Sequence, residues 1–218
     1  MKKNIYCLID TETSKMTDVY DLGIIIFDKK GNVLFERNYC NMDVFGNDNM
    51  MKNAYYAWKM PLYKENKNIV RCDTRSMMYD FLYTMKLYNV THLLAYNLAF
   101  DINALDKTYM QFCNRHFNTE KIILVDVMRI AIDVIINTDK YRNFCEKNNE
   151  YTPKGFYKSS AESVYRYINN ENDFIEDHTA LSDCYCEYNI FMKCLKQKKK
   201  INIGIEDNLW KKIQKGKL

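Results

Sequence analysis

The sequence has no apolar run approaching the roughly 20 residues that a membrane-spanning helix needs. Its opening residues, MKKNIYCLID, reach an acidic residue too early for the apolar segment of a secretory signal. These two absences predict an intracellular protein that works in the cytoplasm and has no membrane partner.

The eight cysteines include no CxxC pair, and several lie inside apolar runs where cysteine acts as a small core residue. Cys184 and Cys186 are both able to ligate a metal. However, positions i and i+2 on the predicted helix point apart. We therefore expect reduced thiols that fill the core, and no zinc site.

Internal repeats and domain linkers are also missing, and 218 residues suffice for one α/β domain with a sizeable core. We assign residues 1–197 to this domain and residues 198–218 to a basic tail. Lysines concentrate near the C-terminus, which leaves the body slightly acidic. The tail suits contact with phosphates, although lysine runs are also typical of a solvated or frayed chain end. Trp210 favours docking or base stacking over pure disorder.

The hydrophobic pattern predicts alternating strands and helices. Strands are expected at residues 4–10, 20–28, 33–40, 91–97 and 121–126. Helices are expected from 73, from about 101, at 127–136, 159–169 and 179–196. We expect residues 41–72 to be an irregular insertion with short helices, and 137–157 to be a polar connection. This order predicts a mixed five-stranded sheet flanked by helices, the ribonuclease H-like α/β architecture.

Two acids stand at the end of the first predicted strand. Asp10 and Glu12 are two residues apart, so their side chains leave the strand on the same face. Each carboxylate raises the pKa of the other unless a cation lies between them. Oxygen ligands of this kind suit Mg²⁺ or Mn²⁺. The alternative interpretation is that the DTE motif simply begins a turn.

A second polar motif, YNLAFD at 96–101, follows the predicted strand at 91–97. It places Asp101 at a sheet edge and at the start of a helix, which is a common ligand position in α/β sheets. Simple N-capping of that helix by Asn97 or Asp101 is the structural alternative.

The third motif, HTALSD at 178–183, opens the last long helix. Five residues at about 100° each put His178 and Asp183 on different faces of an ideal helix, so His178 must precede the first turn. Thr179 is a suitable N-cap. An imidazole on a loop beside a fixed carboxylate is suited to general-base catalysis. A lone histidine would otherwise be interpreted as a surface or loop residue.

Together, DxE, NxxFD and HxxxxD resemble the motifs of the DnaQ-like exonucleases of the DEDDh subtype, in the same order over roughly residues 4–195. Thr179 stands where the related tyrosine subtype carries its tyrosine. Tyr96 replaces the histidine that is common before Asn97 in the family. The glycine that the family often carries after the first motif is not obvious here.

The resemblance implies a two-metal 3′→5′ exonuclease that uses Mg²⁺ or Mn²⁺. Its metal ligands would be Asp10, Glu12, Asp101 and Asp183, with His178 as the general base. It would act on the 3′ ends of single-stranded DNA or RNA and release nucleoside 5′-monophosphates. The same resemblance implies that substrate would be bound by Thr11, Thr13, Met16 and Asn97.

Other roles remain open at this point. The chain could be a proofreading subunit that docks to a polymerase, or an exoribonuclease that processes RNA or short oligonucleotides. A nuclease-like fold that only binds nucleic acid is a further alternative, disfavoured by the intact set of five residues. Dimers are common in the family. Within the insertion, Tyr55, Tyr56 and Trp58 are able to stack bases, although core packing is the favoured interpretation.

Overall fold

The computed structural model describes residues 4–14, 17–52, 54, 60–197, 201, 203–206 and 208–216. Four residues singled out in the sequence lie outside these described residues: Met16, Tyr55, Tyr56 and Trp58. Among the described helices, none is long and apolar enough to cross a membrane. All eight cysteines are free thiols, as the sequence predicted.

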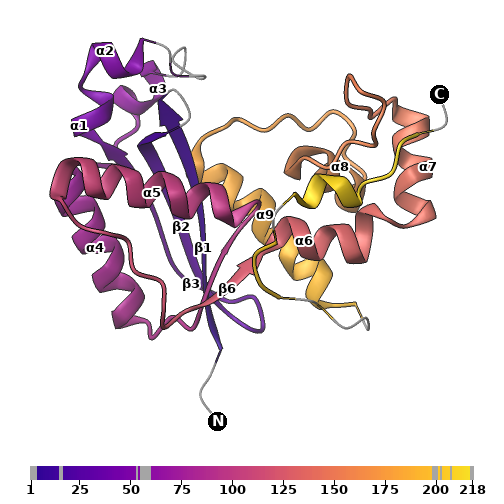
Figure 1. Cartoon of the computed structure of the whole chain (residues 1–218), viewed down its shortest axis with the longest axis horizontal. Coiled ribbons are helices and arrows are strands. Elements are labelled where there is room, and N and C mark those ends of the chain that lie inside the picture. The colour runs from indigo at the N-terminus through magenta and orange to yellow at the C-terminus, as the bar shows by residue number, and fades with distance from the viewer. Residues whose placement is uncertain are drawn as a thin grey trace.

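A six-stranded mixed sheet, in the order β4-β3-β2-β1-β5-β6, forms the centre of the molecule (Figure 1). Its strands are β1 (Ile5–Ser14), β2 (Asp18–Asp28), β3 (Val33–Asn41), β4 (Ile69–Cys72), β5 (His92–Ala95) and β6 (Ile123–Asp126). The pairs β1–β2 and β2–β3 are antiparallel, whereas β1–β5, β5–β6 and β3–β4 are parallel. The predicted mixed α/β fold is confirmed. The predicted number of five strands is wrong, because β4 in the insertion pairs with β3.

Helices cover both faces of the sheet, because alternate residues of its strands are apolar on both sides. Ile5, Cys7 and Ile9 of β1 pack with α4 (Thr74–Leu87) and α5 (Leu98–Cys113). Tyr6 and Leu8 face the other layer, which contains α6 (Val127–Ala131), α8 (Ala161–Asn169) and α9 (Ala180–Leu195). The two faces of β1 therefore belong to two separate cores.

The insertion at 41–72 contains three short helices followed by β4. They are α1 (Met42–Phe45), α2 (Asp48–Met51) and α3 (Met60–Glu65). Val44, Phe45, Met51 and Tyr63 join Tyr20 of β2 in a third apolar cluster. The insertion is thus packed on the sheet, with its short helices as predicted.

The segment 137–157 is not a simple polar connection, since it contains helix α7 (Asp139–Asn148). Thr138 is the N-cap, and its hydroxyl accepts a hydrogen bond from the backbone N–H of Tyr141. Before it, the predicted helix at 127–136 consists of α6 and a π-helical turn, η2 (Ile132–Ile136). This half of the molecule therefore has more helix than the sequence suggested.

The described residues of the C-terminal tail lie on the body of the protein. They include a 3₁₀ helix, η3 (Leu209–Lys212), in which Leu209 is buried. Ile213 is also buried, and Glu206 forms an ion pair with Arg129 of α6. Lys215 pairs with Phe156 as an isolated β-bridge. These contacts attach the tail to the layer that contains α6, whereas Trp210 is 57% exposed.

Candidate active site

β1 continues beyond its parallel neighbour, and this extension carries the DxE motif. Pairing between β1 and β5 ends at Leu8, whereas β1 itself runs to Ser14. Asp10 and Glu12 follow Leu8 at intervals of two, so they lie on the face that α9 covers. Both acids therefore stand past the carboxyl end of β5, inside the strand rather than at its end as predicted.

Asp101 reaches the same edge from α5, which begins at Leu98, three residues earlier than predicted. The side chain is buried, and one of its oxygens accepts a hydrogen bond of 2.8 Å from the hydroxyl of Thr11. Thr11 alternates with Asp10 and Glu12 on β1, so its hydroxyl points to the α5 layer. One strand thus contributes to the site from both faces.

Asn97 occupies the N-cap position of α5 with a left-handed backbone, φ 70°, but its side chain makes no capping hydrogen bond. Asp126 at the end of β6 performs that task, since its oxygens accept from the N–H groups of Asn97 and Leu98 at 3.3 and 3.2 Å. The capping alternative for Asn97 and Asp101 is therefore wrong, and Asp126 anchors the start of α5.

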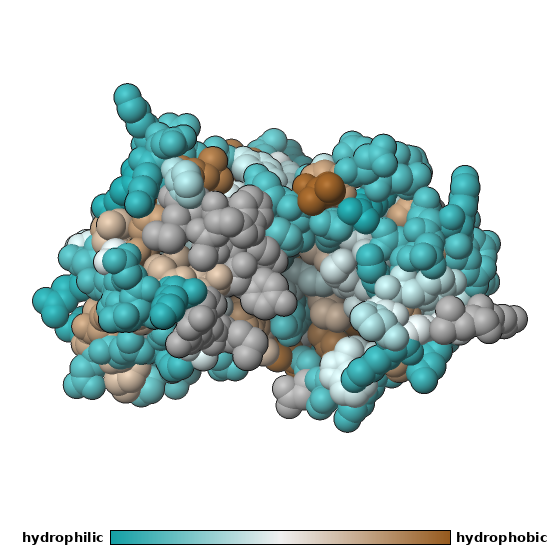
Figure 2. All heavy atoms as spheres, turned by 90° about the horizontal axis from the view of Figure 1, so that it is seen from above, coloured by the Kyte–Doolittle hydropathy of each residue, from teal (hydrophilic) through white to brown (hydrophobic). Residues whose placement is uncertain are grey.

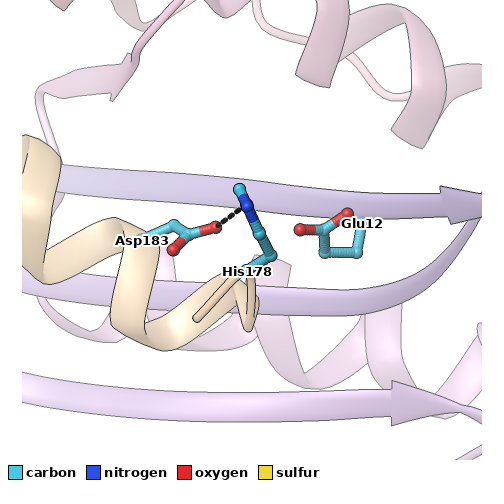
Figure 3. Close-up of side chains that lie close together, drawn as sticks. All are labelled: Glu12, His178 and Asp183. Carbon is cyan, nitrogen blue, oxygen red and sulfur yellow. Dashed lines mark ion pairs between the residues drawn. The ribbon is translucent and has the colours of Figure 1, made fainter. Parts of the chain in front are cut away.

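His178 and Asp183 come from the start of α9. As predicted, Thr179 is the N-cap and His178 precedes the helix, with a left-handed backbone at φ 54°. Its Nδ1 lies 4.0 Å from an oxygen of Asp183 and 4.0 Å from an oxygen of Glu176. Figure 3 shows the imidazole between the carboxylates of Asp183 and Glu12. One ligand atom from each of these three side chains lies within 4.8 Å of the other two.

Gly23 on β2 permits this approach of α9 to the sheet. It is the register partner of Asp10. A Cβ at this position would come within 2.3 Å of the backbone carbonyl of Ala180, in the first turn of α9. Any side chain here would push the helix away from β1, so Gly23 sets how closely Asp183 approaches Asp10.

Asp21, also on β2 and opposite Glu12, holds the first N–H of the same helix. It is fully buried, and one oxygen accepts from the backbone N–H of Ala180 at 2.9 Å. Its oxygens also accept hydrogen bonds from Asn38 and from Tyr63 of α3. A carboxylate at a helix N-terminus is favoured by the helix dipole. The insertion thereby supports the start of α9 through Tyr63 and Asp21.

In the absence of a cation, burial and neighbouring charges favour the protonated states of Asp10 and Asp101. Burial raises the pKa of Asp10 well above its usual value, and the charges of Glu187, Asp101, Asp183 and Glu12 raise it further. Burial likewise raises the pKa of Asp101 to about 7, although the Thr11 hydroxyl opposes this shift. A cation at this position would remove the conflict, because it favours the charged form of every neighbouring acid.

Glu187 is a buried acid of this cluster that the sequence analysis missed. Its pKa is raised well above the usual value by burial and by the charges of Asp101 and Asp183, although the backbone N–H of Tyr96 donates to it at 2.9 Å. It follows Asp183 by four residues, so the two acids share one face of α9. That spacing was a usable signal, but the helix was interpreted by its apolar residues alone.

The acidic cluster lies towards the end of the molecule to which β1 runs. Viewed from that side, Figure 2 shows a surface hollowed between the half with α1 to α5 and the half with α7 and α8. The carboxylate oxygens of this cluster form a donor set that fits a divalent cation such as Mg²⁺ or Mn²⁺, with the His178 imidazole within 4.8 Å of the Glu12 and Asp183 oxygens. Of the predicted substrate residues, Thr11 and Thr13 are buried on β1 and Asn97 is exposed.

No protein-family model matches the sequence, and a search of curated proteins finds no significant match. Solved structures do share the fold. E. coli exonuclease I in complex with a dT13 oligonucleotide superposes with a TM-score of 0.55 at 12% identity, covering 90% of this chain and 41% of that chain. Its zinc-ion-bound complex with single-stranded DNA superposes with a TM-score of 0.54 at 12% identity, covering 89% of this chain and 40% of that chain. The chain thus spans less than half of exonuclease I.

Cell-death related nuclease 4 shares the fold as well, with a TM-score of 0.53 at 10% identity, covering 92% of this chain and 66% of that chain. The predicted resemblance to DnaQ-like exonucleases in architecture is therefore confirmed at the level of the fold. At these identities the agreement concerns the arrangement of helices and strands.

Proposed function

We propose that this chain is a metal-dependent 3′→5′ exonuclease that acts on single-stranded DNA or RNA and releases nucleoside 5′-monophosphates. The observation that carries the proposal is that Asp10, Glu12, Asp101, Asp183 and His178, spread over the whole sequence, meet at one edge of the sheet. The mutual repulsion of these acids lowers the stability of the metal-free protein. Acids that cost stability in this way are better explained by a chemical role than by a role in packing.

In this proposal Asp10, Glu12, Asp101 and Asp183 hold two divalent cations, Mg²⁺ or Mn²⁺. Cations at such a site stabilise the charge that develops on the attacking and leaving oxygens of a phosphodiester. His178 accepts the proton of the attacking water, and its loop position leaves the ring 31% exposed to the cleft. Asp183 lies 4.0 Å from this imidazole and favours its protonated form after the transfer.

Thr11, Thr13 and Asn97 belong to the proposed substrate end of the site. The Thr11 hydroxyl donates to Asp101, so it orients a metal ligand in addition to any contact of its backbone with a nucleotide. Asn97 precedes α5 with an αL backbone. Its amide side chain does not cap the helix, which leaves it for the terminal nucleotide.

The shared fold supports this assignment in one further respect. Exonuclease I with the same architecture has been captured with single-stranded DNA and, in one complex, with a zinc ion. Those substrates suggest the class to test first for this chain. The RNA-processing alternative uses the same site, so the RNA substrate in the same assay addresses it. The polymerase-docking alternative is distinguished only by a stable complex with a polymerase.

The test is digestion of 5′-labelled single-stranded DNA and RNA with Mg²⁺ or Mn²⁺, using wild type, Asp10→Asn and Asp139→Asn proteins. Asp139 is a matched control because its side chain is 92% exposed on α7. We expect a ladder that shortens from the 3′ end, no shortening with chelator or with Asp10→Asn, and wild-type rates for Asp139→Asn. A chain that shortens neither polymer with either metal would refute the proposal.

A further inference from the structure

Helix α4 carries an exposed stripe of basic and aromatic side chains. Arg75, Tyr79 and Tyr83 follow one another at intervals of four, so they lie along one face of the helix. Tyr79 is 70% and Tyr83 54% exposed. Their rings are stacked, with planes 9° from parallel and centroids 6.3 Å apart. The helix thus presents two nearly parallel tyrosine rings to solvent.

The same stripe borders a pocket of about 290 Å³ between α4 and the end of α5, lined by Arg75, Tyr79, Tyr109, Cys113 and Arg115. Two arginines meet there, yet neither forms an ion pair with an acidic side chain in the described part of the chain. The acids nearby in sequence have other partners, since Asp73 accepts from the N–H of Ser76 and Asp80 pairs with Arg37. The pocket therefore carries two arginines outside any ion pair between described residues, although Arg75 does act on Asp73, whose pKa is lowered by its hydrogen bonds with Ser76 and then by the charge of Arg75.

Helix α5 connects this surface to the candidate active site. Asp101 lies in its first turn and Tyr109 eight residues later, about 12 Å along the helix axis. Thr108 fixes this part of α5, because its hydroxyl accepts from the N–H of Val19 at 2.9 Å beside the β1–β2 turn. Next to Asp101, Phe100 is 40% exposed. Helix α5 thus carries Asp101 of the acidic cluster at its start and, nearer its end, Tyr109 and Cys113, which line the pocket beside the stripe.

We propose that Arg75, Tyr79, Tyr83 and Arg115, the arginine–tyrosine surface, bind the single-stranded nucleic acid upstream of the 3′ end that occupies the acidic cluster. Exposed aromatic rings stack bases without regard to sequence, and arginines neutralise backbone phosphates. The acidic cluster repels the phosphates of a nucleic acid. Cationic side chains such as these arginines offset that repulsion and attract the nucleic acid to the protein. This inference rests on the proposed exonuclease function and extends it to substrate length.

The test compares a trinucleotide with an oligonucleotide of about 20 residues, measuring kcat and KM across a range of salt concentrations. The variants are Arg75→Ala with Arg115→Ala, and Tyr79→Ala with Tyr83→Ala. The control variant is Lys29→Ala with Lys30→Ala, which also removes two cations but from the exposed β2–β3 turn. We expect KM for the long strand to rise about tenfold or more in both test variants, with trinucleotide kinetics unchanged. The salt slope should fall by roughly 1.4 for the arginine pair, at about 0.7 per phosphate contact.

Several results would overturn the inference. Unchanged KM and salt slope for the long strand, with full digestion by the wild type, would refute the surface while leaving the exonuclease function intact. That result would assign the stripe to a protein partner, since tyrosine and arginine are also common in such interfaces. Equal losses on both substrates would show damage to the acidic cluster. A wild type inactive on both lengths would refute the proposed function itself.

Discussion

His178 and Asp183 are held by one helix in different ways. Asp183 lies in the first turn of α9, where its N–H bonds the carbonyl of Thr179, whereas His178 precedes the cap. The imidazole is therefore able to turn without breaking helical hydrogen bonds, while the carboxylate stays fixed. The five-residue spacing in the sequence was sufficient to predict this difference, because it is incompatible with one ideal helix face.

Replacing His178 by alanine should abolish most of the activity and leave the fold intact. Loss of a general base typically costs about 10²–10⁴ in rate, so we expect kcat to fall by that factor with little change in KM. His116→Ala is the control, because that ring is 69% exposed on a loop and pairs with Asp106, away from the acidic cluster. Steady-state kinetics and circular dichroism of both variants give the answer. Equal kcat for the two would exclude His178 as the base.

Removing the metal should make stability depend on pH in a defined direction. The raised pKa of Asp101, about 7 against an ordinary 3.8, means that the folded chain keeps a proton that the unfolded chain has lost between these values. The free energy of unfolding of the metal-free protein therefore falls as pH rises from about 4 to about 7. We expect a lower melting temperature with chelator at about pH 8 than at about pH 6, and a larger increase on adding Mn²⁺ at the higher pH.

This experiment has a clear opposite outcome. If the cluster does not bind a cation, Mn²⁺ will leave the melting temperature unchanged at both pH values. The Asp10→Asn protein is the internal comparison, because it removes one of the repelling charges. It should be less sensitive to pH without metal and should respond less to Mn²⁺.

Among the elements, strongly periodic helices and buried strands were predicted from the sequence, whereas α7 and β4 were not. In α7 only Tyr141 and Cys145 are buried, so its apolar stripe is too narrow to stand out from a polar segment. β4 is four residues long with one buried residue, Ile69, because it pairs at the edge of the sheet. Tertiary pairing, which the local pattern does not contain, creates such a strand.

The residues that hold α9 against the sheet at the candidate site were likewise not predicted from the sequence. Asp21 and Gly23 both lie in the strand predicted at residues 20–28, and the sequence pattern singled out neither of them. Their roles depend on the first turn of α9, which is more than 150 residues away in sequence. No local pattern contains that contact. The motif residues were found because the periodicity placed them near the ends of predicted strands and helices, although β1 in fact continues past Asp10 and Glu12 to Ser14.

Gly23→Ala should damage both stability and catalysis. The new methyl group would meet the backbone of Ala180, which cannot move aside like a flexible side chain. Overpacking of this kind costs about 1–3 kcal/mol, and a shift of α9 displaces His178 and Asp183 from Asp10. We expect a lower melting temperature and a kcat reduced about tenfold or more. Val33→Ala, at a position 40% exposed on β3, should change neither quantity. A fully active Gly23→Ala protein would show that the helix tolerates displacement.

For the whole molecule, the tail raises the question of whether residues after 197 contribute to stability. Leu209 and Ile213 are buried, and the N–H of Tyr157 donates to the carbonyl of Gln214 at 3.2 Å. Burial of each such side chain contributes about 1.5–3 kcal/mol. A chain ending at residue 197 should therefore unfold at a lower urea concentration than the full chain. Trp210→Ala, which removes an exposed ring, should leave the midpoint unchanged.

The opposite result would also be informative. An unchanged urea midpoint after truncation would mean that the contacts of Leu209 and Ile213 do not hold in solution. Activity of the truncated chain on the long oligonucleotide would then separate a role of the tail lysines in substrate binding from a role in folding. A tail that only stabilises the body should not alter the salt dependence of KM.

The acidic cluster joins the first strand to the last long helix, since Asp183 follows Asp10 by 173 positions. At a ribosome that adds about 5–20 residues each second, roughly nine to thirty-five seconds separate the synthesis of these two carboxylates. During that interval the nascent chain carries Asp10 and Glu12 without the helix that completes their site. The proposed nuclease site therefore remains incomplete at the ribosome until residues up to 195 have emerged and α9 has packed over Gly23.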